Sequence, residues 1–160
     1  MIDYRWATPE ELEAAARFFA AEIARDDSYV SHGEVQTGLS EDGRHWVADL
    51  EARMVEDFLD PGPDRSVALA LRDGRMVGAL VALFTRTERV AYLTIEDLVV
   101  APEARSAGVG AALVAFAEEE ARARGLTWAF LESGLDNHGA HQFFERKGFR
   151  AMSKVFSKPL

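Results

Sequence analysis

The spacing of apolar residues changes along the chain, and each change predicts a different kind of secondary structure. In the first third, apolar residues recur every three or four positions, as they do in helices that bury one face. Thr8-Pro-Glu-Glu11 has the cap, proline and glutamate of a helix start, and Asp60-Pro-Gly-Pro63 ends the second predicted helix. The two apolar stripes are Leu12-Ala16-Phe19-Ile23 and Val47-Leu50-Met54-Phe58.

Valine, leucine, alanine and aromatic residues dominate three consecutive segments in the middle of the chain. These segments, 66–72, 76–84 and 90–100, predict strands. Asp73-Gly74 is typical of a tight turn between antiparallel strands. The middle of the chain therefore predicts an antiparallel meander.

Helical and strand patterns alternate again in the last third. The remaining predicted elements are strands at 2–6, 128–133 and 149–157, helices at 108–124 and 138–147, and an irregular polar loop at 26–43. The resulting order, β-α-α-β-β-β-α-β-α-β, predicts an α+β fold (mixed α/β in other conventions) with helices flanking a central sheet.

Composition and charge narrow the class of protein. A chain of 160 residues with 48% apolar residues suits a single domain over 1–160. The absence of cysteine excludes disulfides, thiolate metal sites and cysteine nucleophiles. Of the net charge of −9, residues 1–64 carry −11 and residues 101–160 carry +1. Because nucleic-acid binding needs a basic surface, we expect no nucleic-acid partner. The acidic part is either a solvated surface or a region that repels anions.

Nothing in the sequence suggests a membrane or a metal. The longest stretch without polar side chains, 107–117, is far shorter than the roughly 20 residues that a membrane span needs. Met1–Trp6 lacks the layout of a signal peptide, so we expect no membrane partner and a cytoplasmic protein. His138 and His141 are spaced like metal ligands on a helix, but no third ligand is evident, so we expect no metal.

The segment Arg105-Ser-Ala-Gly-Val-Gly110 connects a predicted strand to a predicted helix. Its glycines let the backbone approach a ligand closely, and the first turn of a helix offers unpaired N–H groups to an anion. Together with Arg105, these features favour a pyrophosphate site. The segment lacks the Gly-Lys-Ser/Thr ending of a Walker loop, and it follows a meander instead of opening a Rossmann unit. An ordinary strand-to-helix turn remains an alternative.

A second sequence block, residues 137–149, supports the interpretation of Arg105–Gly110 as a pyrophosphate site. Asn137-His-Gly-Ala-His-Gln-Phe-Phe-Glu-Arg-Lys-Gly-Phe149 and the segment Ile95–Gly110, in this order of elements, resemble the GNAT superfamily of acyl-CoA-dependent N-acetyltransferases over most of the chain. The resemblance implies a mostly antiparallel, twisted sheet, acetyl-CoA (coenzyme A) as the cofactor, and fourth and fifth strands that splay apart to admit it. The cofactor-binding residues that it implies are Leu98, Val99, Val100, Arg105, Ser106, Ala107, Gly108, Val109, Gly110, Ala111, Asn137, Ala140, Phe143 and Phe144.

Acetyl transfer to an amine needs a base, because only about one alkylamine in a thousand is neutral at pH 7. Glu96 is the expected catalytic base, since it lies on the central strand four residues before Val100. Strand alternation places Glu96 and Asp97 on opposite faces, so one of them should point toward the substrate. The alternative to a catalytic role is that both carboxylates are capped or form ion pairs that only stabilise the fold. Phe144 stands where the family usually has a tyrosine that protonates the leaving thiolate. The alternative function is therefore a non-catalytic acyl-CoA-binding or sensing module.

The resemblance places the loop between the first two helices in the acceptor site. The carboxylates of Asp26 and Asp27 there, with Glu96, favour a small cationic amine: a polyamine, an aminoglycoside or an amino acid. Tyr29 suits a cation–π contact with an ammonium group. Protein N-termini and lysines remain alternative acceptors. Val155-Phe156 on an edge strand would permit a homodimer.

Overall fold

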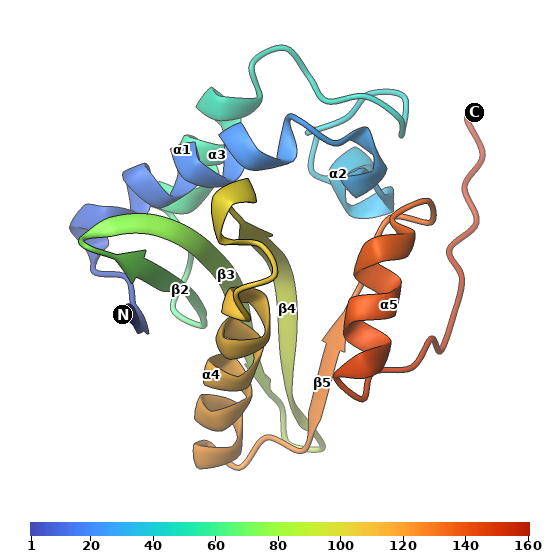
Figure 1. Cartoon of the computed structure of the whole chain (residues 1–160). Helices are drawn as coiled ribbons and strands as arrows, with labels where there is room; N and C mark the ends of the chain where they lie inside the picture. Colours follow the sequence, from blue (N-terminus) through green and yellow to red (C-terminus); the bar gives the residue numbers. More distant parts are fainter. The chain divides into compact units, whose positions relative to one another are not determined.

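The structure is a computed structural model that describes all 160 residues, and it divides into two compact units. The sheet unit comprises Met1–Ile23 and Glu51–Glu132, and the second unit comprises Ala24–Leu50 and Ser133–Leu160. All five strands lie in the sheet unit (Figure 1). No helix of the chain has the length and apolar character needed to cross a membrane.

The elements follow the predicted order closely. The strands are β1 (Ile2–Trp6), β2 (Arg65–Arg72), β3 (Arg75–Arg86), β4 (Ala91–Val100) and β5 (Trp128–Leu131). The helices are α1 (Leu12–Ile23), α2 (His32–Gln36), α3 (Leu50–Leu59), α4 (Val109–Ala123) and α5 (His138–Arg146), with 3₁₀ turns at Pro9–Glu11, Asp27–Tyr29 and Pro102–Ala104.

The strands form one sheet in the order β1-β2-β3-β4-β5. The first three pairings are antiparallel, as the predicted meander requires, and only β4 and β5 run parallel. Helix α4 connects the two parallel strands, which a tight turn cannot join. The predicted α+β fold with a mostly antiparallel sheet is confirmed.

The central strands are covered on both faces. Consecutive residues of β2 and β3 are buried, and this pattern arises only when neither face meets water. Helices α1 and α4 both pack against these strands. Phe19 of α1 lies 5.4 Å from Phe58 of α3, measured between ring centroids, so α3 packs on α1.

The first helix starts at the predicted signal. Thr8 caps the turn at Pro9–Glu11, and the Glu11 carboxylate accepts a 2.9 Å hydrogen bond from the Thr8 backbone N–H. Arg5 donates to both oxygens of the same carboxylate, at 2.7 and 2.6 Å. The Arg5 hydrogen bonds, followed by the Thr8 N–H, lower the pKa of Glu11 to about 2.

Three sequence predictions are wrong in detail. Residues 149–157 form no strand: they are without regular structure and, except for half-buried Phe149, exposed, because a strand is stable only when its backbone is paired with another. Val155 and Phe156 are 59% and 91% exposed, so the edge strand expected to permit a homodimer is not formed. The loop at 26–43 contains two short helical segments, and α3 begins at Leu50, leaving Val47 outside it.

Gly78 allows α4 to lie close to the sheet. A Cβ atom added at Gly78 of β3 would lie 2.8 Å from Cγ1 of Val109 and 3.1 Å from Cδ1 of Leu113. Both side chains belong to the first two turns of α4, and both are buried. The start of α4 is therefore positioned by the missing side chain of a strand residue.

Replacing Gly78 with alanine should lower the free energy of unfolding by about 1–3 kcal/mol, because a crowded core side chain forces its neighbours to move. Denaturant unfolding measures the change. Gly139→Ala is the matched control, since an added Cβ there meets nothing within 4 Å. Gly139 lies inside α5, so its replacement should stabilise the protein by about 0.5–1 kcal/mol. Equal effects of the two substitutions would contradict the packing argument.

Candidate active site

Strand β4 loses its parallel neighbour halfway along its length. The pairing with β5 runs from Tyr92–Trp128 to Ile95–Leu131, whereas β4 continues to Val100. Strand β5 itself ends at Leu131, whereas β4 runs on past it (Figure 1). The segment Glu96–Val100 has β3 on one side and no strand on the other. Strand β4 therefore outlasts its neighbour, while the splay expected between the two strands stays a prediction.

A β-bulge coincides with the end of that pairing. On β3, Val81 pairs with Asp97 and Ala82 pairs with Ile95, so Glu96 is the extra residue. A bulge bends its strand and re-aims the side chains beside it. The simple alternation used to place Glu96 and Asp97 on opposite faces therefore does not apply across this position.

Glu96 is held by an arginine that the sequence analysis did not single out. Arg65, the first residue of β2, donates through Nε to Oε2 of Glu96 at 2.7 Å and through Nη2 to Oε1 at 3.1 Å. The side chains are 34% and 27% exposed. This hydrogen bond is the main cause that raises the pKa of Arg65 above its ordinary value. The expected base is thus a carboxylate paired with a guanidinium.

Beyond Val100, the chain forms the exposed turn that the sequence predicts as a pyrophosphate site. Arg105 folds back over the strand end, and its Nε donates to the carbonyl oxygen of Val100 at 3.1 Å. Ser106 and Gly108 both have positive φ angles, of 66° and 79°. Gly108 is the N-cap of α4, and an added Cβ there would meet nothing within 4 Å. The backbone at Gly108 is therefore open to an approaching ligand.

The first turn of α4 points unpaired donors out of the helix. Ala112 donates to the carbonyl oxygen of Gly108, but Val109, Gly110 and Ala111 have no backbone acceptor. No side chain caps this end of the helix. Unpaired N–H groups and the positive end of the helix dipole favour an anion at this position.

The expected acceptor residues other than Glu96 lie in the second unit, where Asp26 already has a structural role. Its Oδ1 accepts from the backbone N–H and the hydroxyl of Ser28, at 2.9 and 2.6 Å. The Tyr29 ring lies 6.3 Å from the Trp46 ring. The backbone of this segment packs against Gly134, where an added Cβ would lie 2.1 Å from the carbonyl oxygen of Ser28.

The remaining expected cofactor residues lie on and before α5, also in the second unit. Asn137 is the N-cap of α5, and its Oδ1 accepts from the N–H of Ala140 at 3.3 Å. The half-buried Phe144 ring packs edge-on against Phe143 and Phe149, at 5.1 and 5.7 Å. Nε2 of His141 donates to the carbonyl oxygen of Gly134 at 2.9 Å, which ties α5 to the preceding loop.

Comparisons with known proteins decide the family. A family model described as "Acetyltransferase (GNAT) family" matches residues 22–149. The chain belongs to the GNAT family. It is 35% identical over 137 residues to the "Uncharacterized N-acetyltransferase YhdJ" of Bacillus subtilis, covering 84% of this chain and 90% of that one. The resemblance inferred from the two sequence blocks is confirmed.

This chain covers less than two thirds of the length of two further relatives. The chain is 33% identical over 100 residues to "Aminoalkylphosphonate N-acetyltransferase" of Salmonella typhimurium, covering 61% of this chain and 65% of that protein. It spans only 39% of a "Mycothiol acetyltransferase" of Streptomyces bingchenggensis, with 34% identity and 81% of this chain covered. Among solved structures, a "Putative acetyl transferase from Pyrococcus furiosus" has a TM-score of 0.71 at 24% identity over both complete chains, which supports the fold.

In this GNAT chain, the structure brings one group of predicted residues together along a single strand, turn and helix. Glu96 and Leu98–Val100 end β4, and Arg105–Ala111 follow directly. The other group, Asp26–Tyr29 and Asn137–Phe144, lies in the second unit. The residue that sequence analysis missed is Arg65, and its only signal was an arginine at the start of a predicted strand.

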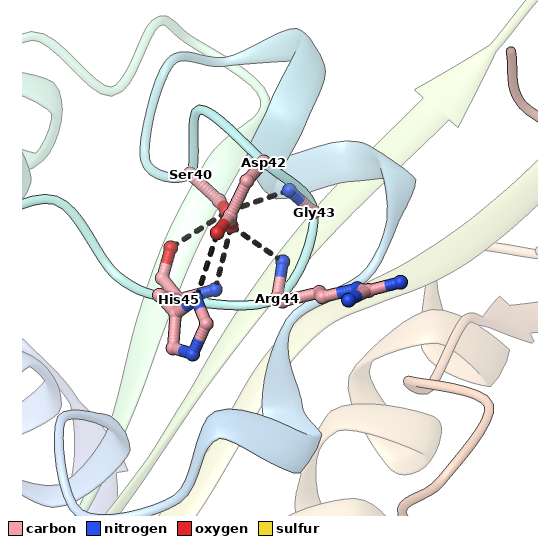
Figure 2. Close-up of polar contacts among 5 residues, drawn as sticks. All are labelled: Ser40, Asp42, Gly43, Arg44 and His45. Atoms are coloured by element: carbon pink, nitrogen blue, oxygen red, sulfur yellow. Dashed lines mark hydrogen bonds and ion pairs between the residues drawn. The ribbon is translucent and has the colours of Figure 1, made fainter. Parts of the chain in front are cut away.

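The loop after α2 in the second unit is ordered by a small polar network. Oδ1 of Asp42 accepts from the backbone N–H groups of Arg44 and His45, both at 2.8 Å, and Oδ2 contacts Nδ1 of His45 at 2.7 Å (Figure 2). The buried hydroxyl of Ser40 donates to the carbonyl oxygen of His45 at 2.7 Å and accepts from the N–H of Gly43. The contact with Asp42 raises the pKa of His45, and the His45 hydrogen bonds hold the pKa of Asp42 well below its ordinary value.

These directions set the pH range in which the contact stabilises the loop. Because the pKa of His45 is raised, its contribution is complete below the ordinary value of 6.5 and is lost as the pH rises through the folded-state pKa. Because the pKa of Asp42 is lowered, its contribution is complete above the ordinary value of 3.8 and is lost as the pH falls. The pair is therefore most stabilising between these two values.

An NMR titration of the His45 imidazole should give a pKa above 6.5 in the unmodified protein. Asp42→Asn should bring the pKa back toward 6.5, because it removes the negative partner. Glu41→Gln is the control, since it removes the same charge from the neighbouring residue without touching the contact. A fall in the His45 pKa that is as large for Glu41→Gln would contradict the assigned partner.

Proposed function

We propose that this protein is an N-acetyltransferase that moves an acetyl group from acetyl-CoA to the primary amine of a small molecule. The observation that carries the proposal is the end of β4, where β5 no longer pairs with it and which leads directly into a turn and a helix start whose N–H groups have no backbone acceptor. An extended ligand with a phosphate group suits both parts at once. Family membership and the matched N-acetyltransferase relatives support the same reaction.

The residues present fit the cofactor. The N–H groups of Val109, Gly110 and Ala111 would hold the pyrophosphate, and the open backbone at Gly108 leaves it room. The backbone of Leu98–Val100 would hold the pantetheine arm in the position of a neighbouring strand. When bound, acetyl-CoA supplies an acetyl group activated as a thioester.

Glu96 would act on the acceptor. We propose that its carboxylate accepts the proton of the incoming amine, directly or through a water molecule, while Arg65 keeps the carboxylate in place. The bulge at Glu96 lies next to the backbone segment assigned to the acyl arm, so base and thioester would share one end of β4.

The acceptor that we propose is a small cationic amine. Asp27 supports this choice because it is exposed and adds a negative charge to the predicted acceptor loop, whereas Asp26 contributes mainly by shaping that loop. Two relatives are named as an aminoalkylphosphonate N-acetyltransferase and a mycothiol acetyltransferase, and these names support a small-molecule acceptor over protein N-termini and lysines. A single domain over 1–160 and a cytoplasmic location stay predictions from the sequence.

A panel of amines tests the proposal. Polyamines, aminoglycosides, amino acids and an aminoalkylphosphonate are each incubated with acetyl-CoA, and release of free thiol is followed. We expect turnover of at least one small amine, with cationic amines preferred. Turnover restricted to acidic or neutral amines would contradict the cationic acceptor. Thiol release with peptide amines alone would indicate that the acceptor is a protein and not a small molecule. Tight binding of acetyl-CoA by calorimetry, without turnover of any amine, would favour the alternative of an acyl-CoA-binding module.

Phe144 favours that alternative, because a phenyl ring cannot protonate the leaving thiolate. A thiol has a pKa of about 8.5, however, so its thiolate is a tolerable leaving group near neutral pH. Phe144→Tyr should therefore change kcat by less than about threefold. Phe143→Tyr, on the adjacent ring, is the control for added bulk. A rise in kcat of about tenfold for Phe144→Tyr alone would show that the missing acid limits the reaction.

A further inference from the structure

The ion pair between Arg65 and Glu96 is anchored at both ends. Glu96 is the extra residue of the bulge in β4, and Arg65 reaches it from β2 across the intervening strand β3. A third donor of the guanidinium, Nη1, bonds to the carbonyl oxygen of Pro61 at 3.2 Å. Both carboxylate oxygens of Glu96 are therefore fixed by an arginine that is itself fixed to the loop after α3.

The surroundings of Arg65 are acidic. Besides Glu96, the carboxylates of Asp57 on α3 and Asp97 on β4 act on its charge. Burial raises the pKa of Asp57, and the charge of Arg65 works in the opposite direction. A two-point contact of this kind fixes the direction of the Glu96 carboxylate, which a lysine at position 65 would not do.

We propose that Arg65 is the positioning residue for Glu96 in the acetyl transfer. By holding both oxygens from one side, Arg65 leaves the outer lone pairs of the carboxylate directed toward the acceptor amine or its water. The inference rests on the proposed function, because Glu96 is the group that would meet the amine. It adds a residue that acts through Glu96 and need not touch either substrate.

Loss of Arg65 should lower kcat without raising the KM for the acceptor. Arg65→Gln frees the Glu96 carboxylate to rotate, and misplacement of a reacting group by about 1 Å costs on the order of 100-fold in rate. The same substitution removes a positive charge from the surroundings of Glu96, so a cationic acceptor should bind at least as well as before. We expect kcat to fall about 10- to 100-fold and the KM for the acceptor not to rise.

Four variants and one control test the inference by steady-state kinetics, with melting temperatures measured in parallel. Arg65→Gln, Arg65→Lys, Glu96→Gln and the double variant Arg65→Gln/Glu96→Gln form the set. Arg5→Gln is the matched control, because Arg5 makes the same two-point contact with Glu11 in the sheet unit at similar exposure. Arg5→Gln should lower the melting temperature and leave kcat unchanged.

If Arg65 acts through Glu96, Arg65→Gln should lower kcat by less than about twofold in the Glu96→Gln background, because the group that it positions is gone. Arg65→Lys should recover only part of the loss. Equal losses of kcat with and without Glu96 would overturn the inference, and so would an unchanged kcat in Arg65→Gln. These two outcomes leave the proposed function standing, because the unmodified protein still acetylates an amine. Failure of the unmodified protein to acetylate any amine would instead overturn the proposed function, and this inference with it.

Discussion

The site depends on one backbone constraint, which is that β5 stops pairing with β4 at Ile95 while β4 continues to Val100. Backbone N–H and C=O groups inside a protein need partners, so a strand that loses its neighbour creates a place for another extended backbone-like group. Peptide recognition at sheet edges uses the same principle. The amide-containing arm of coenzyme A suits such a place, and the turn that follows suits its phosphates.

The packing of α4 connects this strand to the anion-binding turn. Gly78 lies beside Val100 in the pairing of β3 with β4, and its missing side chain admits Val109 and Leu113 of α4. The helix therefore begins close to the end of β4. Only the turn of residues 101–108 separates them, and Arg105 in this turn bonds back to Val100. A change at Gly78 would move the donor groups of the first helical turn relative to the strand, so the fold and the proposed cofactor site share this contact.

The features that the sequence could predict are those that depend on residues close together in the chain. The turn at Arg105–Gly110 was predictable because glycine conformation and helix starts are local properties. The bulge at Glu96 was not, because a bulge is a mismatch between two paired strands and neither strand shows it alone. Arg65 was missed for a similar reason, since its side chain reaches a strand two places away in the sheet. The strand predicted at 149–157 failed because apolar residues without a paired backbone do not form a strand.

The net charge of a segment does not show which of its carboxylates are free to bind a ligand, because some are already engaged in hydrogen bonds and ion pairs. The carboxylates of the predicted acceptor loop favoured a cationic acceptor, yet Asp26 and Asp42 use their carboxylates to order their own loops. At the end of β4, Glu96 and Asp97 share the field of Arg65, so this acidic group is partly neutralised from within. A carboxylate that is held but not buried can orient an amine without trapping it, because the cation already present weakens its attraction for a second one. Orientation by a fixed ion pair, more than net charge, is thus the property that would let this site select an amine and release its product.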